Sequence, residues 1–104
     1  MYFKFGVDSF IWTEKFSEKD LWIIPKAKEL GFEVIDFAIS DPFSFPVKAV
    51  KEKLLEVGID CVCTTTLNNK TNPISPDKEI REKAVNAMKK CVDICEELGS
   101  PILG

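Results

Sequence analysis

The chain has 104 residues, of which 45% are hydrophobic and 30% charged, a composition typical of globular rather than disordered or fibrous proteins. Its 14 basic and 17 acidic residues form no basic cluster, which argues against nucleic acid as a partner. No segment reaches the roughly 20 apolar residues that cross a bilayer, and residues 1–7 lack the pattern of a signal peptide. We expect one domain over residues 1–104, located in the cytoplasm.

The first element is predicted to be a strand over residues 3–8, where polar and apolar residues alternate. An aromatic loop over residues 9–16 follows it. Ser17 and Asp20 resemble a capping box, with aspartate in place of the usual Glu or Gln. They predict the start of a helix that ends at Gly31.

The second and third strands are predicted on either side of a second helix. Residues 33–39 are almost continuously apolar apart from Asp36, as expected for a strand covered on both faces. The helix is predicted over residues 46–57, with a proline in its first turn, and it ends at Gly58. Residues 59–66 form the third predicted strand.

The last helix is predicted to begin at Ser75-Pro76-Asp77, read as an N-cap, a proline at the first helical position and a carboxylate in the first turn. Gly99 ends this helix, and residues 101–104 begin a fourth strand. Its apolar face is predicted to carry Ile80, Ala84, Met88, Cys91, Cys95 and Leu98.

This strict alternation predicts an α/β fold with parallel strands. A doubly wound sheet that binds a nucleotide has a glycine-rich first turn, and residues 8–16 contain no glycine. A (β/α)8 barrel needs about 250 residues and eight units. We therefore expect the N-terminal part of a TIM barrel, about three and a half βα units long.

Polar side chains are predicted at one end of this sheet, where ligands of α/β proteins bind. Side-chain alternation places Asp8, Asp36, Thr64 and Thr66 on one face near the carboxyl ends of the strands. They could form a wall that binds hydroxyl groups or supports a metal. Alternatively, Asp8 caps a turn, Asp36 satisfies a buried partner and the threonines are simply good strand formers.

In the aromatic first loop, Trp12 and Phe16 could stack on the apolar face of a sugar. A packed hydrophobic loop is the alternative.

The four cysteines could be placed in a zinc site, since Cys61 and Cys63 share a strand face and Cys91 and Cys95 share a helix face. Their spacing matches neither a zinc ribbon nor a finger, so we interpret them as small buried hydrophobic residues. The chain has no histidine, which excludes a Ser-His-Asp or Cys-His mechanism within it.

Five short motifs follow one another along the whole chain. They are Phe5-Gly6-Val7 with Trp12, Glu29-Leu30-Gly31-Phe32, Thr64 to Leu67 after a valine-cysteine strand, Ser75-Pro76-Asp77 with Arg81, and Leu98-Gly99-Ser100-Pro101. In this order they resemble the ketose 3-epimerases, the D-tagatose and D-psicose 3-epimerases among the xylose-isomerase-like TIM barrels.

The resemblance implies a complete barrel that binds manganese, cobalt or magnesium through two glutamates, an aspartate and a histidine. One glutamate removes the C3 proton of a ketose, and the other returns a proton to the opposite face. In the family these ligands come from later strands, so we expect no catalytic residue, metal ligand or cofactor within residues 1–104.

The resemblance also implies contacts with the far end of the sugar. Asp8 stands where family members often carry an aromatic residue, Phe16 where an aromatic loop residue covers the sugar, and Thr64 where a small residue contacts it. Asp8 departs from the pattern, because a carboxylate prefers a hydroxyl group to a C–H face, and this leaves the sugar and the exact isomerase or epimerase reaction open. The predicted substrate-binding residues are Asp8, Trp12, Phe16, Asp36, Thr64 and Thr66.

Three functions follow from these observations. The first is the N-terminal segment of a metal-dependent sugar epimerase that acts on ketoses and forms a homo-oligomer. The second is a non-catalytic half barrel that self-associates through its open sheet edges. The third, a DNA-repair endonuclease of the same superfamily, is disfavoured by the acidic balance of the chain.

Overall fold

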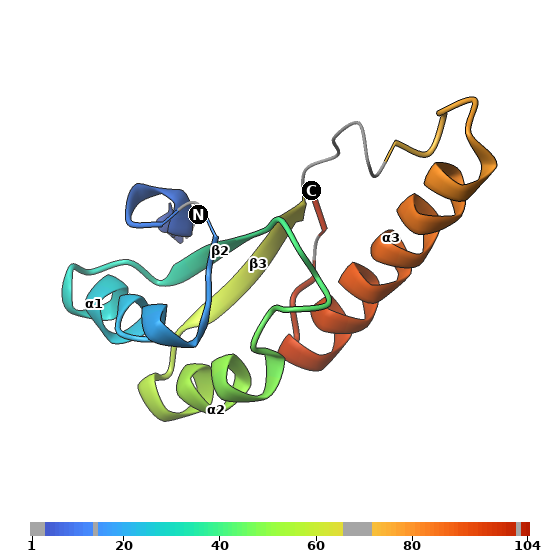
Figure 1. The fold of residues 1–104 in the computed structure, drawn as a ribbon. Coiled ribbons are helices and arrows are strands. Elements are labelled where there is room, and N and C mark those ends of the chain that lie inside the picture. The colour runs from blue at the N-terminus through green and yellow to red at the C-terminus, as the bar shows by residue number, and fades with distance from the viewer. Residues whose placement is uncertain (1–3, 14, 66–71, 102) are drawn as a thin grey trace.

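Strands and helices alternate along the chain in the computed structural model (Figure 1), which describes residues 4–13, 15–65, 72–101 and 103–104. The elements are β1 (Gly6–Asp8), the 3-10 turns η1 (Ser9–Ile11) and η2 (Glu18–Asp20), α1 (Ile23–Glu29), β2 (Val34–Ile39), α2 (Val47–Val57), β3 (Asp60–Thr65) and α3 (Lys78–Leu98). No helix in the described ranges is long and apolar enough to cross a membrane.

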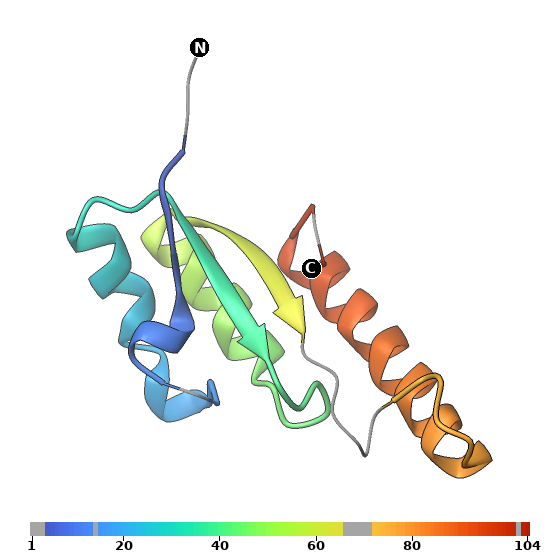
Figure 2. The ribbon, with the colours of Figure 1, turned by 90° about the horizontal axis from the view of Figure 1, so that it is seen from above.

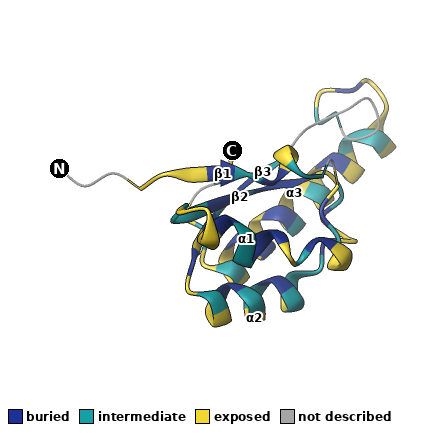
Figure 3. Ribbon diagram, turned by 90° about the vertical axis from the view of Figure 1, so that its left-hand side faces the viewer, coloured by how far each residue is buried: buried dark blue, intermediate teal, exposed yellow. Residues whose placement is uncertain are grey.

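The three strands form one parallel sheet in the order β1-β2-β3. A fourth strand begins beyond β3, because Leu103 forms a parallel bridge with Cys63 and the N–H of Gly104 donates to the carbonyl of Cys63 at 2.9 Å. The helices lie on one side of the sheet (Figures 2 and 3), and the opposite side is open. The predicted α/β fold with parallel strands is confirmed.

The hydrophobic core lies between the sheet and the helices. Every second residue of β2, namely Ile35, Phe37 and Ile39, points into it and is almost fully buried. This period of two is the alternation of side chains along a strand, so the intervening residues face the open side. The helices contribute Ile23, Ile24, Ala27, Val50, Leu54, Ala84, Cys91, Ile94 and Cys95.

Each helix is followed by a glycine with a positive φ angle, namely Gly31 at 94°, Gly58 at 75° and Gly99 at 73°. Residues with a Cβ rarely adopt this conformation, whereas glycine adopts it without steric cost. The predicted junction between helix and strand is therefore confirmed three times.

The capping box at Ser17 and Asp20 is also confirmed, since the carboxylate of Asp20 accepts from the N–H of Ser17 at 3.0 Å and from its hydroxyl at 3.1 Å. It opens the 3-10 turn η2 rather than α1, which begins at Ile23.

The predicted start of the last helix is wrong by two residues. Asp77, not Ser75, is the N-cap of α3, because Asp77 has extended backbone angles and its Oδ1 accepts from the N–H of Glu79 at 2.9 Å. The hydroxyl of Ser75 accepts from the N–H of Asp77 at 3.2 Å, so Ser75 closes the preceding turn. Asp and Ser are both good N-caps, and sequence alone does not separate two candidates this close together.

One residue of the predicted apolar face of α3 is also misplaced. Met88 is 41% exposed, whereas Ile94, which the prediction omitted, is buried. The buried face of α3 is centred on Ala84, Cys91 and Ile94. Residues on a helix are 100° apart, so Met88 lies at the edge of this face, on the side of the exposed Val85 and Val92. Met88 is an exposed flank residue in this structure.

Candidate functional site

The predicted polar wall is present on the open side of the sheet. The register places Asp8 opposite Asp36 and Ala38 opposite Thr64, so all three polar residues share the side that the helices do not cover. Thr66 lies outside the described residues. The carboxyl ends of the strands therefore bring together Asp8, Asp36 and Thr64.

Each carboxylate of this wall uses one oxygen within the protein. The hydroxyl of Thr64 donates to Oδ1 of Asp36, and the backbone N–H of Phe10 donates to Oδ1 of Asp8 at 2.8 Å. Asp8 thus caps the turn η1, as the structural alternative predicts. Asp36 has a hydroxyl partner, but this partner, Thr64, is half-buried rather than buried. Within the described residues, the second oxygen of each carboxylate has no protein donor, which leaves two acceptors at this end of the sheet.

Ser9 is a site residue that sequence reasoning missed. Its side chain is buried, and its hydroxyl accepts from the N–H of Ala38 at 3.1 Å. This bond continues the β1–β2 pairing one residue past the end of β1 and anchors η1 to the carboxyl end of β2. A serine directly after a strand end is a weak signal for such a bond, because serine hydroxyls commonly bond to nearby backbone in turns.

The two predicted aromatic residues have different environments. Trp12 is partly exposed and packs edge-on against Trp22, with ring centroids 6.2 Å apart. Phe16 is 4% exposed and lies in the core, with its ring 5.0 Å from Phe37 and 5.7 Å from Phe45. Because these partners lie on the helix side of the sheet, the structure does not bring Phe16 to the polar wall. For Phe16 the packed-loop alternative holds.

The wall is acidic. The strands β1, β2 and β3 contain no lysine or arginine, and neither Asp8 nor Asp36 forms an ion pair within the described part of the chain. The nearest loops carry an exposed pair, Lys15 with Asp41, whose N–O distance is 3.9 Å.

A divalent metal does not fit the residues at hand. In the described ranges, no three Asp, Glu, Cys or His side chains lie close enough together to hold an ion, and the sequence contains no histidine. We therefore assign no step of a reaction to a metal held by these residues.

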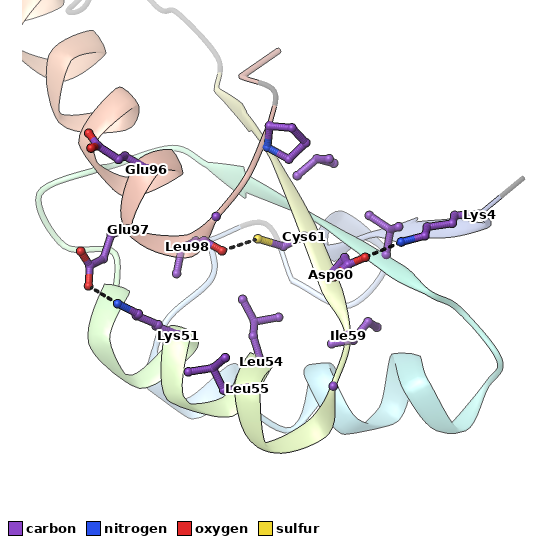
Figure 4. A pocket seen from close by; sticks show the side chains of 15 residues that line it. Lys4, Lys51, Leu54, Leu55, Ile59, Asp60, Cys61, Glu96, Glu97 and Leu98 are labelled. Carbon is purple, nitrogen blue, oxygen red and sulfur yellow. Dashed lines mark hydrogen bonds and ion pairs between the residues drawn. The ribbon is translucent and has the colours of Figure 1, made fainter.

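A separate hollow of about 820 Å³ lies between α2, α3 and β3 (Figure 4). Its floor is apolar, with Leu54 and Leu98, and its rim carries the ion pair Lys51–Glu97 at 2.8 Å. Asp60 at its edge is the first residue of β3 and pairs with Lys4 at 2.6 Å. The hollow thus opens at the amino end of the strand, away from the polar wall and from the end at which barrel enzymes bind their substrates.

The four cysteines are free and buried in the core between β3 and α3, which confirms their interpretation as small hydrophobic residues. A hydrogen bond between the thiols of Cys61 and Cys63 lowers the pKa of Cys61 and raises that of Cys63. Burial raises the pKa of Cys91, and it raises the pKa of Cys95 to about 11. Neutral thiols are therefore favoured at three of the four positions.

The raised pKa of Cys95 predicts a loss of stability in alkaline solution. Between pH 9.0, the ordinary pKa of a cysteine thiol, and about pH 11, Cys95 is deprotonated in the unfolded chain but keeps its proton in the folded chain. The free energy of unfolding therefore falls as the pH rises through this range. Urea unfolding at pH 8 and pH 10.5 should show a smaller pH dependence in Cys95→Ala than in the unmodified chain. Equal pH dependence in the two proteins would contradict the prediction.

Comparisons with known proteins agree with this geometry. Residues 24–104 match the family described as Xylose isomerase-like TIM barrel. The chain is 30% identical over 98 residues to a ketose 3-epimerase of Arthrobacter globiformis, an alignment that covers 93% of this chain and 34% of the relative. A probable ketose 3-epimerase of Synechocystis is 25% identical over 101 residues, covering 92% and 33%.

A solved structure shows the same arrangement of elements. The crystal structure of D-allulose 3-epimerase from Methylomonas sp. in complex with D-allulose superposes with a TM-score of 0.88 at 25% identity, covering 96% of this chain and 35% of the other. The chain spans about a third of the length of the curated relatives it matches. Its sequence match, its parallel sheet and its row of covering helices lead to one conclusion: the chain belongs to the xylose isomerase-like TIM barrel family.

Proposed function

We propose that these residues form part of the substrate wall of a ketose 3-epimerase barrel. The observation that carries the proposal is the position of Asp8, Asp36 and Thr64 on the open side of the sheet, at the carboxyl ends of adjacent strands. This is the end at which TIM-barrel enzymes bind their substrates. The epimerase relatives in the two comparisons support the same choice.

The chemistry of the wall favours a neutral polyol. Asp8 and Asp36 are opposite each other in the register, and like charges in this position repel. Sugar hydroxyl groups that donate to the two available carboxylate oxygens would stabilise the pair, and hydrogen bonds to charged groups are the stronger ones. A phosphorylated sugar would bring further negative charge to strands that carry no lysine or arginine. We therefore propose a free ketose as the substrate.

The removal and return of the C3 proton, and the divalent metal, are assigned in this proposal to other parts of a longer barrel. The absence of histidine from the sequence supports this division, because the ligand set implied by the resemblance includes one. Within the described residues, Ser9 would anchor the loop after β1 beside the sugar through its bond with Ala38, and the packing of Trp12 against Trp22 and the core would help to hold this loop.

A chimera tests the proposal. The 104 residues would replace the corresponding N-terminal third of the Methylomonas D-allulose 3-epimerase, onto which they superpose with a TM-score of 0.88. With manganese added, we expect the chimera to epimerise D-fructose or D-tagatose, and the parent enzyme is the positive control. A chimera that has native circular dichroism and binds manganese but converts neither ketose would contradict the proposal. The isolated chain should show no turnover.

A further inference from the structure

Four Asp or Asn residues of the described chain close a turn in the same way, by accepting a hydrogen bond from the backbone N–H two residues ahead. They are Asp8, Asp41, Asn72 and Asp77, with N–O distances between 2.8 and 3.1 Å. The turn uses only one side-chain oxygen, so an amide serves it as well as a carboxylate does, as Asn72 shows. The turn therefore does not require the negative charge of the three aspartates.

At two of these aspartates the negative charge has a second use. The Oδ2 of Asp41 accepts from the hydroxyl of Ser44 at 2.9 Å and lies 3.9 Å from the ammonium group of Lys15. Asp77 precedes the 21-residue helix α3, whose N-terminus favours a negative charge. Asp8 differs from both, because η1 has only three residues and the Asp8 carboxylate forms no ion pair within the described ranges.

The charge of Asp8 is also unfavourable in its surroundings. Asp8 lies opposite Asp36 in the register of β1 and β2, and like charges on directly opposite residues repel. An asparagine would keep the bond from the N–H of Phe10 and remove this repulsion. The described residues therefore give no structural reason for a carboxylate at this position, at the end of the sheet where the substrate wall lies.

We propose that Asp8 determines substrate specificity, with its second carboxylate oxygen accepting a hydrogen bond from one hydroxyl group of the ketose away from C3. The inference rests on the proposed function, which makes this wall the substrate surface and assigns the chemistry at C3 to other parts of the barrel. An ionised carboxylate only accepts hydrogen bonds, so a ketose that lacks this hydroxyl group offers it no donor. Such an analogue is rejected, because its binding removes water from the carboxylate without replacing it.

Asp8→Asn in the epimerase chimera tests this inference. Asparagine is as good a cap as aspartate, and its free end is an NH2 group that donates where the carboxylate oxygen accepts. The substrates are whichever of D-fructose and D-tagatose the chimera converts faster, and the 1-, 4-, 5- and 6-deoxy forms of that ketose. Manganese is added throughout.

We expect the unmodified chimera to convert one of the four deoxy ketoses with a kcat/KM about 10- to 100-fold below that of the full ketose, as for the loss of a hydrogen bond to a charged group. In Asp8→Asn this discrimination should disappear, because the full ketose loses the same bond. The ratio of the two kcat/KM values within each protein cancels differences in reactivity and in the amount of folded enzyme. The thermal midpoint of Asp8→Asn should not fall, since the turn keeps its hydrogen bond.

The matched control is Asp41→Asn, the same change at the same kind of turn, where both carboxylate oxygens already have protein donors. It should leave the discrimination intact. An active chimera that treats all four deoxy ketoses like the full ketose, or a discrimination that persists in Asp8→Asn, would overturn the inference alone. So would a clear fall in the thermal midpoint of Asp8→Asn, because the protein itself would then use the charge. A folded, manganese-binding chimera that converts none of the ketoses would overturn the proposed function and the inference together.

Discussion

Replacing Phe37 by alanine is expected to lower the free energy of unfolding by about 3–5 kcal/mol, the usual effect of removing a buried aromatic side chain. Phe37 is completely buried, and its ring lies 5.0 Å from that of Phe16 and 5.7 Å from that of Phe45. Three terms contribute to this decrease: the lost transfer free energy of the buried ring, the lost edge-to-face contacts with the neighbouring rings, and the cost of the cavity that remains. Domains of this size are stable by only about 5–15 kcal/mol, so the variant should be close to unfolded.

The matched control for this substitution is Phe43→Ala. Phe43 has the same side chain only six residues away, but it is 66% exposed in the loop after β2. Its replacement should change the free energy of unfolding by less than about 0.5 kcal/mol. Urea unfolding followed by circular dichroism measures both variants. Equal effects at the two positions would show that the three-ring cluster is not the centre of the core.

In the epimerase chimera, Asp36→Ala is expected to lower kcat/KM for the ketose by about 10- to 100-fold. The substitution removes an acceptor for a substrate hydroxyl group, and a hydrogen bond to a charged group contributes about 1.5–3 kcal/mol. It also leaves the hydroxyl of Thr64 without the acceptor to which it donates. The lower kcat/KM should come mainly from a higher KM, with kcat little changed, because in our proposal this wall binds the substrate without taking part in proton transfer.

The control for this prediction is Asp60→Asn, which removes a carboxylate at the amino end of β3, where it pairs with Lys4. That end of the sheet is far from the proposed substrate, so the kinetics should remain unchanged. The thermal midpoint of each variant separates a kinetic effect from a folding defect. An Asp36→Ala chimera that is folded and fully active would exclude Asp36 from the substrate wall.

Sequence patterns predicted the elements of this fold well because they depend on local rules. Each of the three glycines with a positive φ angle follows the end of a helix, as the C-cap rule predicts. The alternation of side chains along a strand assigns Asp8, Asp36 and Thr64 to one side of the sheet. In parallel strands the carboxyl ends meet at one edge, so the polar wall also followed from the order of elements.

The two wrong predictions, the N-cap of α3 and the burial of Met88, concern positions where the local sequence allows more than one outcome. Asp77 and Ser75 are both residue types that cap helices well. In the structure the helix begins after Asp77, and Ser75 lies in the turn before it. Met88 has the i, i+4 spacing of a core residue, but it lies at the edge of the buried face of α3, on the side of the exposed Val85 and Val92.

The sequence by itself determined that the chain alternates parallel strands with helices, and that two aspartates and a threonine share the carboxyl end of the sheet, because both properties follow from periods of two and 3.6 residues. Only the tertiary structure decided which atoms these side chains bind and that Phe16 packs in the core rather than at the wall. The same holds for the anchor formed by Ser9 and Ala38. Such contacts join residues that are distant in the chain, and their geometry depends on how whole elements pack.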